Sequence, residues 1–234
     1  MKKGIVLTLA TMATTLSLEA SSLSLELRSK TIGHCYPLVK GVPERVQEGG
    51  EVVPLLYASY LVDIHHVIEF LEQRMRIGDD PRMAPLSEEC RDRTSAVMRD
   101  IYYFRTQLGK VAPDPTSEAQ NYRYYLESLR DEPYRYIGHI WVFYQYLATS
   151  GWRCGTTVGT NLELGLEALN TYGYGGQLRQ RRYGLRHCLD RLQLESEEIR
   201  EIVAVEVPAA LDYLDGILQS KIAETCIEDA DRTR

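Results

Sequence analysis

The stretch YRYIGHIWVFYQYLATSGWRCGTTVG, residues 134–159, decides the fold class of this chain. It is dense in aromatic residues up to Ser150, and its apolar residues recur at helical spacing rather than in strict alternation. Gly151, Gly155 and Gly159 then interrupt the helical pattern. Because glycine weakens a helix interior, the sequence predicts a helix that is kinked or loosened around these positions.

The same helical spacing covers the rest of the chain from about residue 23. No run of alternating β-branched residues bounded by turn residues occurs, so the sequence predicts an all-α fold. Short connections between the helices favour a single compact multi-helix domain. The predicted helices cover residues 23–33, 52–76, 87–108, 117–129, 131–150, 177–192 and 197–223.

Local signals mark several helix ends. Three serines stand before helical runs and predict N-caps, namely Ser87, Ser117 and Ser196. Ser117 also has a glutamine three residues later, which is the spacing of a capping box. Gly109 predicts the end of the helix before it, and Pro208 predicts a kink inside the last helix because proline has no backbone donor.

The composition is that of an ordinary soluble globular protein. Of 234 residues, 44% are hydrophobic and 26% are charged, and 27 Lys+Arg against 33 Asp+Glu give a net charge of −6. A chain of this length buries enough surface to fold without a disulfide or a structural metal. The acidic balance argues against a nucleic-acid binder, because neutralising phosphates requires a basic face.

The amino-terminal segment resembles a targeting sequence. Two lysines precede an apolar run over residues 4–18, which is signal-like but shorter than the roughly 20 residues a membrane-spanning helix needs. We therefore expect residues 1–21 to be a hydrophobic leader outside the fold, with a signal or transit segment and a merely hydrophobic leader as the two alternatives. We expect residues 22–226 to form the helical domain and residues 227–234 to form a polar tail. No transmembrane helix is expected.

The cysteines indicate a reducing environment. The five of them are widely spaced and include no C-x-x-C pair, so neither a disulfide framework nor a thiolate zinc site is indicated. We expect an intracellular protein, cytoplasmic or organellar, with export as the alternative if the leader directs it. The cysteines are Cys35, Cys90, Cys154, Cys188 and Cys226.

The sequence lacks the signature motifs of several enzyme classes. Serine-hydrolase, Walker A and dinucleotide-binding motifs are all missing from the sequence. A di-iron bundle needs Glu-x-x-His pairs on facing helices, and Asp63-x-x-His66 is the nearest approach.

Two groups of residues could bind a ligand. His34 follows a short amphipathic helix, where a neutral imidazole could face a groove. Arg182 and Arg186 lie four residues apart on a basic helix, so both project to the same side and could grip carboxylates. The alternatives are an ordinary hydrogen-bonded histidine and a solvated charged helix face.

In their order along about 200 residues, these segments resemble the haem oxygenase family. Leu27-Arg28-Ser29-Lys30-Thr31 followed by His34 resembles the L-[KR]-x-x-T helix that leads to the family's haem-ligating histidine. The other matching segments are Pro54–Glu72, Arg93–Ile101, Glu132–His139, Arg182 with Arg186, and Glu197–Leu218.

The resemblance implies a function and a site. His34 would be the axial ligand of the haem iron, and Arg28, Arg182 and Arg186 would help to bind haem, the latter two through its propionates. Thr149 and Gly151 would line the distal, catalytic side. Haem would be both cofactor and substrate, cleaved with O₂ to biliverdin, CO and ferrous iron by electrons from a reductase or ferredoxin.

The chain departs from the family pattern at two places. Thr31 and His34 are three residues apart, whereas the family spacing is four, which moves the imidazole by about 100° on a continuing helix. The distal G-D-x-S-G-G pattern is replaced by ATSGWR at residues 148–153, which contains no aspartate.

These departures leave three alternatives open. The protein could bind haem without turnover, as a carrier or sensor. His66 could replace His34 as the iron ligand. The chain could also be a helical enzyme acting on a small metabolite or an interaction domain with a tyrosine-rich surface. For such an enzyme the cluster to test is Asp63, His66, Glu69 and Glu72.

Overall fold

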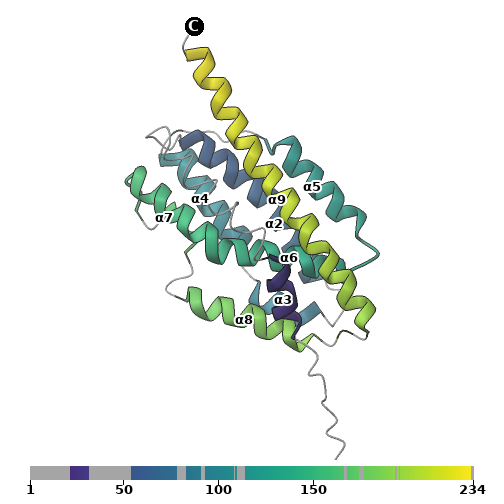
Figure 1. The fold of residues 1–234 in the computed structure, drawn as a ribbon. Coiled ribbons are helices and arrows are strands. Elements are labelled where there is room, and N and C mark those ends of the chain that lie inside the picture. The colour runs from purple at the N-terminus through teal and green to yellow at the C-terminus, as the bar shows by residue number, and fades with distance from the viewer. Residues whose placement is uncertain are drawn as a thin grey trace, which may run out of the picture.

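A computed structural model describes residues 22–31, 54–77, 83–90, 93–107, 109, 114–165, 168–173, 177–192, 194 and 196–232. Within these ranges every regular element is helical and no strand occurs (Figure 1). The prediction of an all-α, single multi-helix domain is confirmed. No helix in the described ranges is both long enough and apolar enough to cross a membrane.

The helices follow one another with short connections. A first helix covers residues 23–31. The others are α2 (Pro54–Ile77), α3 (Ala84–Glu89), α4 (Arg93–Gln107), α5 (Ser117–Ser128), α6 (Arg135–Tyr146), the π-helical turn η2 (Leu147–Gly151), α7 (Trp152–Asn161), α8 (Leu178–Arg191) and α9 (Glu197–Arg232).

Helix α6 is the centre of the domain. Every residue from Tyr136 to Tyr146 is buried, because α9 packs along one side of the helix while α2 and η2 also contact it (Figure 1). Trp141 and Phe143 are among the largest fully buried side chains. Since burying one such ring contributes roughly 1.5–3 kcal/mol, the aromatic density of this stretch explains its central position.

Carboxylates on some helices cap the amino termini of others. Asp63 of α2 accepts hydrogen bonds from the Thr116 amide and hydroxyl, at 2.8 and 2.9 Å, where α5 begins. Asp190 of α8 accepts from the amide and hydroxyl of Ser24, at 2.9 and 3.0 Å, in the first helix. The first four amides of a helix have no partner within it, and a carboxylate there also interacts favourably with the helix dipole.

Glu72 of α2 makes the third such cap, and it corrects a prediction. Its Oε1 accepts from the amides of Arg93 and Thr94 at 2.7 and 3.2 Å, so a new helix, α4, begins there. The single helix predicted over residues 87–108 is therefore wrong. Ser87 lies inside the short helix α3, where its hydroxyl donates to the Ala84 carbonyl.

Three other predicted helix ends can be compared with the structure. Ser117 is not the N-cap of α5, because Thr116 holds that position and accepts from the Ala119 amide. Ser196 does cap α9, with its Oγ 3.3 Å from the Ile199 amide. Gly109 follows the end of α4 with a φ of +60°, a left-handed conformation that glycine adopts at little cost.

The loosened helix predicted near Gly151 takes the form of the π-turn η2 between α6 and α7. The last helix runs further than predicted, to Arg232 instead of residue 223, and continues across Pro208. No glycine or proline follows Gly216 to end it. In Figure 1 this helix crosses the front of the domain and projects beyond it.

Replacing Asp63 by alanine should lower the free energy of unfolding by about 1–3 kcal/mol, because two donors at the start of α5 lose their acceptor. Urea unfolding followed by circular dichroism measures this. The control is Glu69→Ala on the same helix, whose carboxylate is half exposed and 3.7 Å from Arg123. We expect that change to cost under about 0.5 kcal/mol. Equal losses in the two variants would contradict the cap.

Candidate functional site

The candidate site is built on the distal segment, which we define as α6, η2 and α7 (residues 135–161). A π-turn has i→i+5 hydrogen bonds, holds one residue more than an α-turn and is frequent at functional sites. Here it separates α6, which is buried from Tyr136 to Tyr146, from α7. The candidate site therefore lies where the backbone of the distal segment changes from α-helical to π-helical hydrogen bonding.

Arg182 of α8 binds this turn directly. Its Nε donates to the Ala148 carbonyl at 2.7 Å, and its Nη2 donates to the same oxygen. Ala148 is 4% exposed, so the guanidinium meets the carbonyl in a largely dry environment, where hydrogen bonds from a charged donor are strong. Arg182 was predicted to bind a carboxylate; the structure places it on the backbone of the distal segment.

Arg186 lies one helical turn further along α8 and has a different environment. Its Nε is buried and makes no hydrogen bond to any residue that the structure describes. The Nε2 of Gln145 on α6 is likewise buried without such a partner, and the whole residue is only 8% exposed. A buried donor without an acceptor costs roughly 1–3 kcal/mol, so each of these groups is suited to an oxygen of a ligand or a water.

Gln145, Ala148 and Arg182 line one small hollow between the distal segment and α8, together with Cys90 and Leu185. Its volume is about 10 Å³, which is enough for a single water molecule at most. A larger ligand group could enter here only if one of these side chains moved.

On another side, two glycines of the distal segment, Gly151 and Gly155, pack against Tyr172. A Cβ atom at Gly151 would lie 2.6 Å from the Tyr172 ring, and one at Gly155 would lie 2.3 Å from it. The tyrosine itself is 3% exposed. These two glycines are therefore required for the close approach of an aromatic ring.

The hydroxyl of Tyr172 belongs to a chain of three. It donates to the Tyr60 hydroxyl at 3.3 Å, which in turn lies 2.8 Å from the Tyr146 hydroxyl. Asp100 fixes the turn that carries Tyr172, because its carboxylate accepts from the amides of Asn170 and Thr171 at 2.8 and 2.7 Å. The chain connects α2, α6 and this turn beside η2.

A second polar cluster holds α6 to α9. Glu206 of α9 lies 3.0 Å from His139 Nε2, 2.6 Å from Arg135 Nε and 2.7 Å from the Tyr125 hydroxyl. Burial raises the pKa of Glu206, but the hydrogen bonds from these three groups outweigh it and lower the pKa to about 2. The carboxylate is ionised at neutral pH, so it accepts from all three.

His139 is neutral inside this cluster. Burial lowers its pKa, and the opposing effect of Glu206 is smaller. Since Nε2 donates to the ionised Glu206, Nδ1 must be the acceptor of the Tyr122 hydroxyl 2.8 Å away. Burial and the hydrogen bond to Glu206 raise the pKa of Tyr125 to about 12, so its hydroxyl stays protonated.

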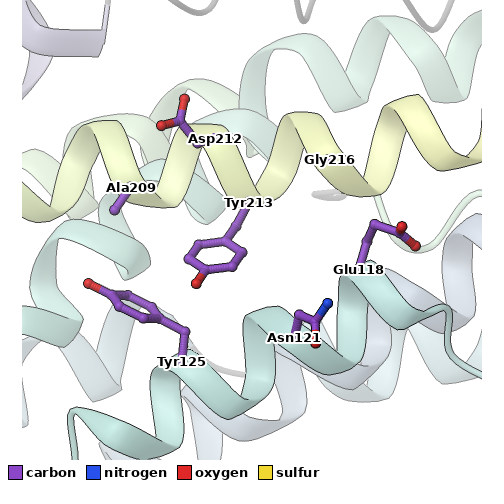
Figure 2. A pocket seen from close by; sticks show the side chains of 7 residues that line it. All are labelled: Glu118, Asn121, Tyr125, Ala209, Asp212, Tyr213 and Gly216. Atoms are coloured by element: carbon purple, nitrogen blue, oxygen red, sulfur yellow. The ribbon is translucent and has the colours of Figure 1, made fainter.

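An open groove of about 480 Å³ adjoins this cluster between α5 and α9 (Figure 2). Tyr125 and Tyr213 line it, with their ring centroids 5.0 Å apart. Tyr213 also stacks on Tyr122 at 4.7 Å. The groove wall is thus the outer side of the same aromatic and polar cluster.

The other predicted site residues have varied positions. His34 lies outside the described residues. Arg28 is exposed on the helix over residues 23–31. Thr149 is half-buried in η2, and its hydroxyl donates to the Gln145 carbonyl at 2.5 Å. His66 lies on α2, its Nδ1 3.5 Å from an Arg123 nitrogen, and burial lowers its pKa, with a further contribution from Arg123.

The alternative cluster on α2 does not converge. Asp63 and Glu72 are buried as caps of α5 and α4. Glu69 instead lies at the surface beside Arg123. Across the described ranges, no group of three or more histidine, cysteine, aspartate or glutamate residues is arranged to hold a metal ion.

Sequence reasoning missed Gln145, Tyr172 and Glu206. Gln145 has the one side-chain amide between Tyr136 and Tyr146. An amide inside so apolar a run could have indicated a polar site. Nothing local indicates Tyr172 or Glu206, because their partners lie on distant helices.

Known proteins match this chain in structure but not in sequence. No family model matches it, and no curated protein matches its sequence. Haem oxygenase-2 of the cyanobacterium Synechocystis sp. PCC 6803, solved with haem and NO, matches with a TM-score of 0.75. The match covers 90% of this chain and 88% of that one at 22% identity. The chain has the haem oxygenase fold.

Two further haem oxygenases support this fold assignment. The enzyme of Leptospira interrogans matches with a TM-score of 0.72 at 19% identity, over 85% of this chain and 99% of its own. Synechocystis haem oxygenase-1, solved with haem, matches at 0.71 and 15% identity, over 91% and 100%. The haem oxygenase fold is thus shared over nearly the whole length, while most side chains differ.

The His139 cluster should make stability depend on pH. The pKa of His139 is lowered in the folded protein, so below about pH 6.5 the unfolded chain binds a proton that the folded one does not. Stability should fall from pH 7 to pH 5, and His139→Gln should make this fall smaller, by up to about 1.4 kcal/mol per pH unit. Urea unfolding at several pH values measures it.

The matched control is His187→Gln, which changes an exposed histidine on α8. It should leave the pH dependence as it is in the unchanged protein. An equal effect of the two substitutions would contradict the assignment of a neutral, buried His139.

Proposed function

We propose that this protein binds haem and cleaves it oxidatively to biliverdin, CO and ferrous iron. The observation that supports haem binding best is the buried Nε of Arg186 on α8, which makes no hydrogen bond to any described residue, in a chain with the haem oxygenase fold. A guanidinium whose donor lacks an acceptor suits a carboxylate, and haem carries two of them as propionates.

The described residues fit such a ligand on its polar side. Arg186 would hold one propionate through the Nε that has no acceptor among the described residues. His34 is the proposed iron ligand. It follows three residues after Thr31, the last described residue before it, and the Thr31 hydroxyl accepts from the Trp141 indole of α6 at 3.0 Å.

Bound haem would supply both the iron at which O₂ reacts and the macrocycle that is oxidised, with electrons from a reductase or ferredoxin. The chain would hold and orient it and supply protons. Residues 146–161 contain no aspartate or glutamate. The hydroxyls of Tyr60, Tyr146 and Tyr172 are the proton-bearing groups arranged beside η2, and we assign the proton supply to them.

A second candidate function is haem binding without turnover, as a carrier or sensor. The favouring observation is the close packing of Tyr172 on Gly151 and Gly155. This packing occupies the glycine face of the distal segment, which the oxygenase proposal assigns to the catalytic side.

Haemin titration of the purified full chain tests the binding proposal. A saturable one-to-one Soret shift is expected, and Arg186→Ala should weaken the affinity about tenfold, the equivalent of one charge-assisted hydrogen bond. The control is Arg179→Ala on the exposed side of the same helix, which should leave the affinity unchanged. No Soret shift in the unchanged protein would refute haem binding.

Adding a reductant in air then separates the two functions. Decay of the Soret band into a biliverdin band indicates the oxygenase, and its loss in His34→Ala would support the iron ligand. A Soret band that is reduced but persists indicates the carrier or sensor. Unchanged biliverdin formation in His34→Ala would refute His34 as ligand and make His66→Ala the next variant to measure.

A further inference from the structure

Arg182 and Arg186 lie on the same side of α8 but differ in their hydrogen bonding. Four residues apart on a helix, they project in nearly the same direction. Arg182 places two donors on the Ala148 carbonyl, whereas the Nε of Arg186 has no acceptor among the described residues. Equal spacing therefore does not mean an equal role.

The acceptor of Arg182 lies inside the π-turn. Where a helix passes from i→i+4 to i→i+5 bonding, the carbonyls of the turn change partners, and a carbonyl can need a donor from outside the helix. The guanidinium supplies two donors to the Ala148 carbonyl, in the hollow of about 10 Å³ that leaves no room for a ligand carboxylate.

We infer that Arg182 is a positioning residue that holds the π-turn η2 in register, and that Arg186 alone of the two binds the ligand's carboxylate. The role of Arg182 in the free protein stands on its own, and the role of Arg186 rests on the proposed function. Without the contact to Ala148, the extra residue of the π-turn could move along the helix.

Such a shift would have a defined structural consequence. Moving one residue of register turns the following helix by about 100°. Gly151 and Gly155 would then leave the ring of Tyr172, where no side chain fits. The contact of Arg182 with Ala148 thus determines which atoms of the distal segment face the Tyr172–Tyr60–Tyr146 hydroxyl chain.

Hydrogen exchange of the free, full-length protein tests the positioning role. In Arg182→Ala, amides in peptides covering residues 145–155 should exchange about tenfold faster, because this segment opens more often. Peptides from residues 197–220 report on global unfolding and should keep their rate. Arg182→Lys, which retains the charge with a single ammonium donor, should give an intermediate rate.

Arg186→Ala and Arg179→Ala are the matched controls, and both should exchange like the unchanged protein in residues 145–155. If Arg182→Ala also shows unchanged exchange there, the inference is overturned. If it unfolds globally, Arg182→Lys decides, because a positioning role requires local acceleration and unchanged exchange in residues 197–220.

Haemin binding tests the division of roles between the two arginines. Arg182→Ala should keep the haemin affinity within about twofold but change the affinity of the bound ferric haem for added cyanide, which reports on the distal side. Arg186→Ala should lower the haemin affinity and leave the cyanide affinity of the bound ferric haem unchanged. Equal losses of haemin affinity in both variants would overturn the division.

The two proposals can fail separately. If the unchanged protein binds no haemin, the proposed function is refuted, and the exchange measurement still decides whether Arg182 holds η2. If haemin binds but Arg182→Ala alters neither exchange nor cyanide affinity, the positioning role is refuted and haem binding stands.

Discussion

The structure depends on buried carboxylates that satisfy backbone amides of distant segments. Asp63 and Glu72, both on α2, fix where α5 and α4 begin, and Asp100 fixes the turn that carries Tyr172. Each of these groups is nearly inaccessible to water, so its charge would be costly without the amides, and the amides would be orphaned without the carboxylate. Because each carboxylate and its amides need one another, these contacts fix the ends of the helices around α6 more firmly than the local sequence of each helix does.

The same constraint shapes the candidate site. Asp100 holds the turn, the turn presents the ring of Tyr172, and the ring requires glycine at 151 and 155 of the distal segment. A different element, α8, contacts the same π-turn at Ala148, where Arg182 donates to the backbone carbonyl. Two other elements therefore contact the π-turn. In an ordinary α-helix of the same sequence, the residues after the turn would be rotated by about 100°, and the glycines would leave the ring of Tyr172.

The sequence predicts the fold class, most helix positions and the irregularity near Gly151, because these follow from apolar spacing and from glycine. It misplaces the start of α4 and the N-cap residue of α5, because Glu72 and Asp63, which bind the amides there, are 21 and 53 residues away along the chain. At the site, the common side of Arg182 and Arg186 is predictable from their spacing. Their different partners are not, since these depend on how α8 lies against η2.

The distal segment contains no acidic residue, and this affects which acceptor the Arg182 guanidinium binds. A carboxylate beside Ala148 would compete with its carbonyl for Arg182, since an ionised acceptor binds a guanidinium more strongly than a neutral one does. With no aspartate or glutamate in residues 146–161, the guanidinium stays on the backbone and Ala148 keeps its donors. Two features therefore occur together: the distal segment has no acidic residue, and Arg182 donates to the backbone of its π-turn. The hydroxyls of Tyr60, Tyr146 and Tyr172 are proton-bearing groups beside this turn.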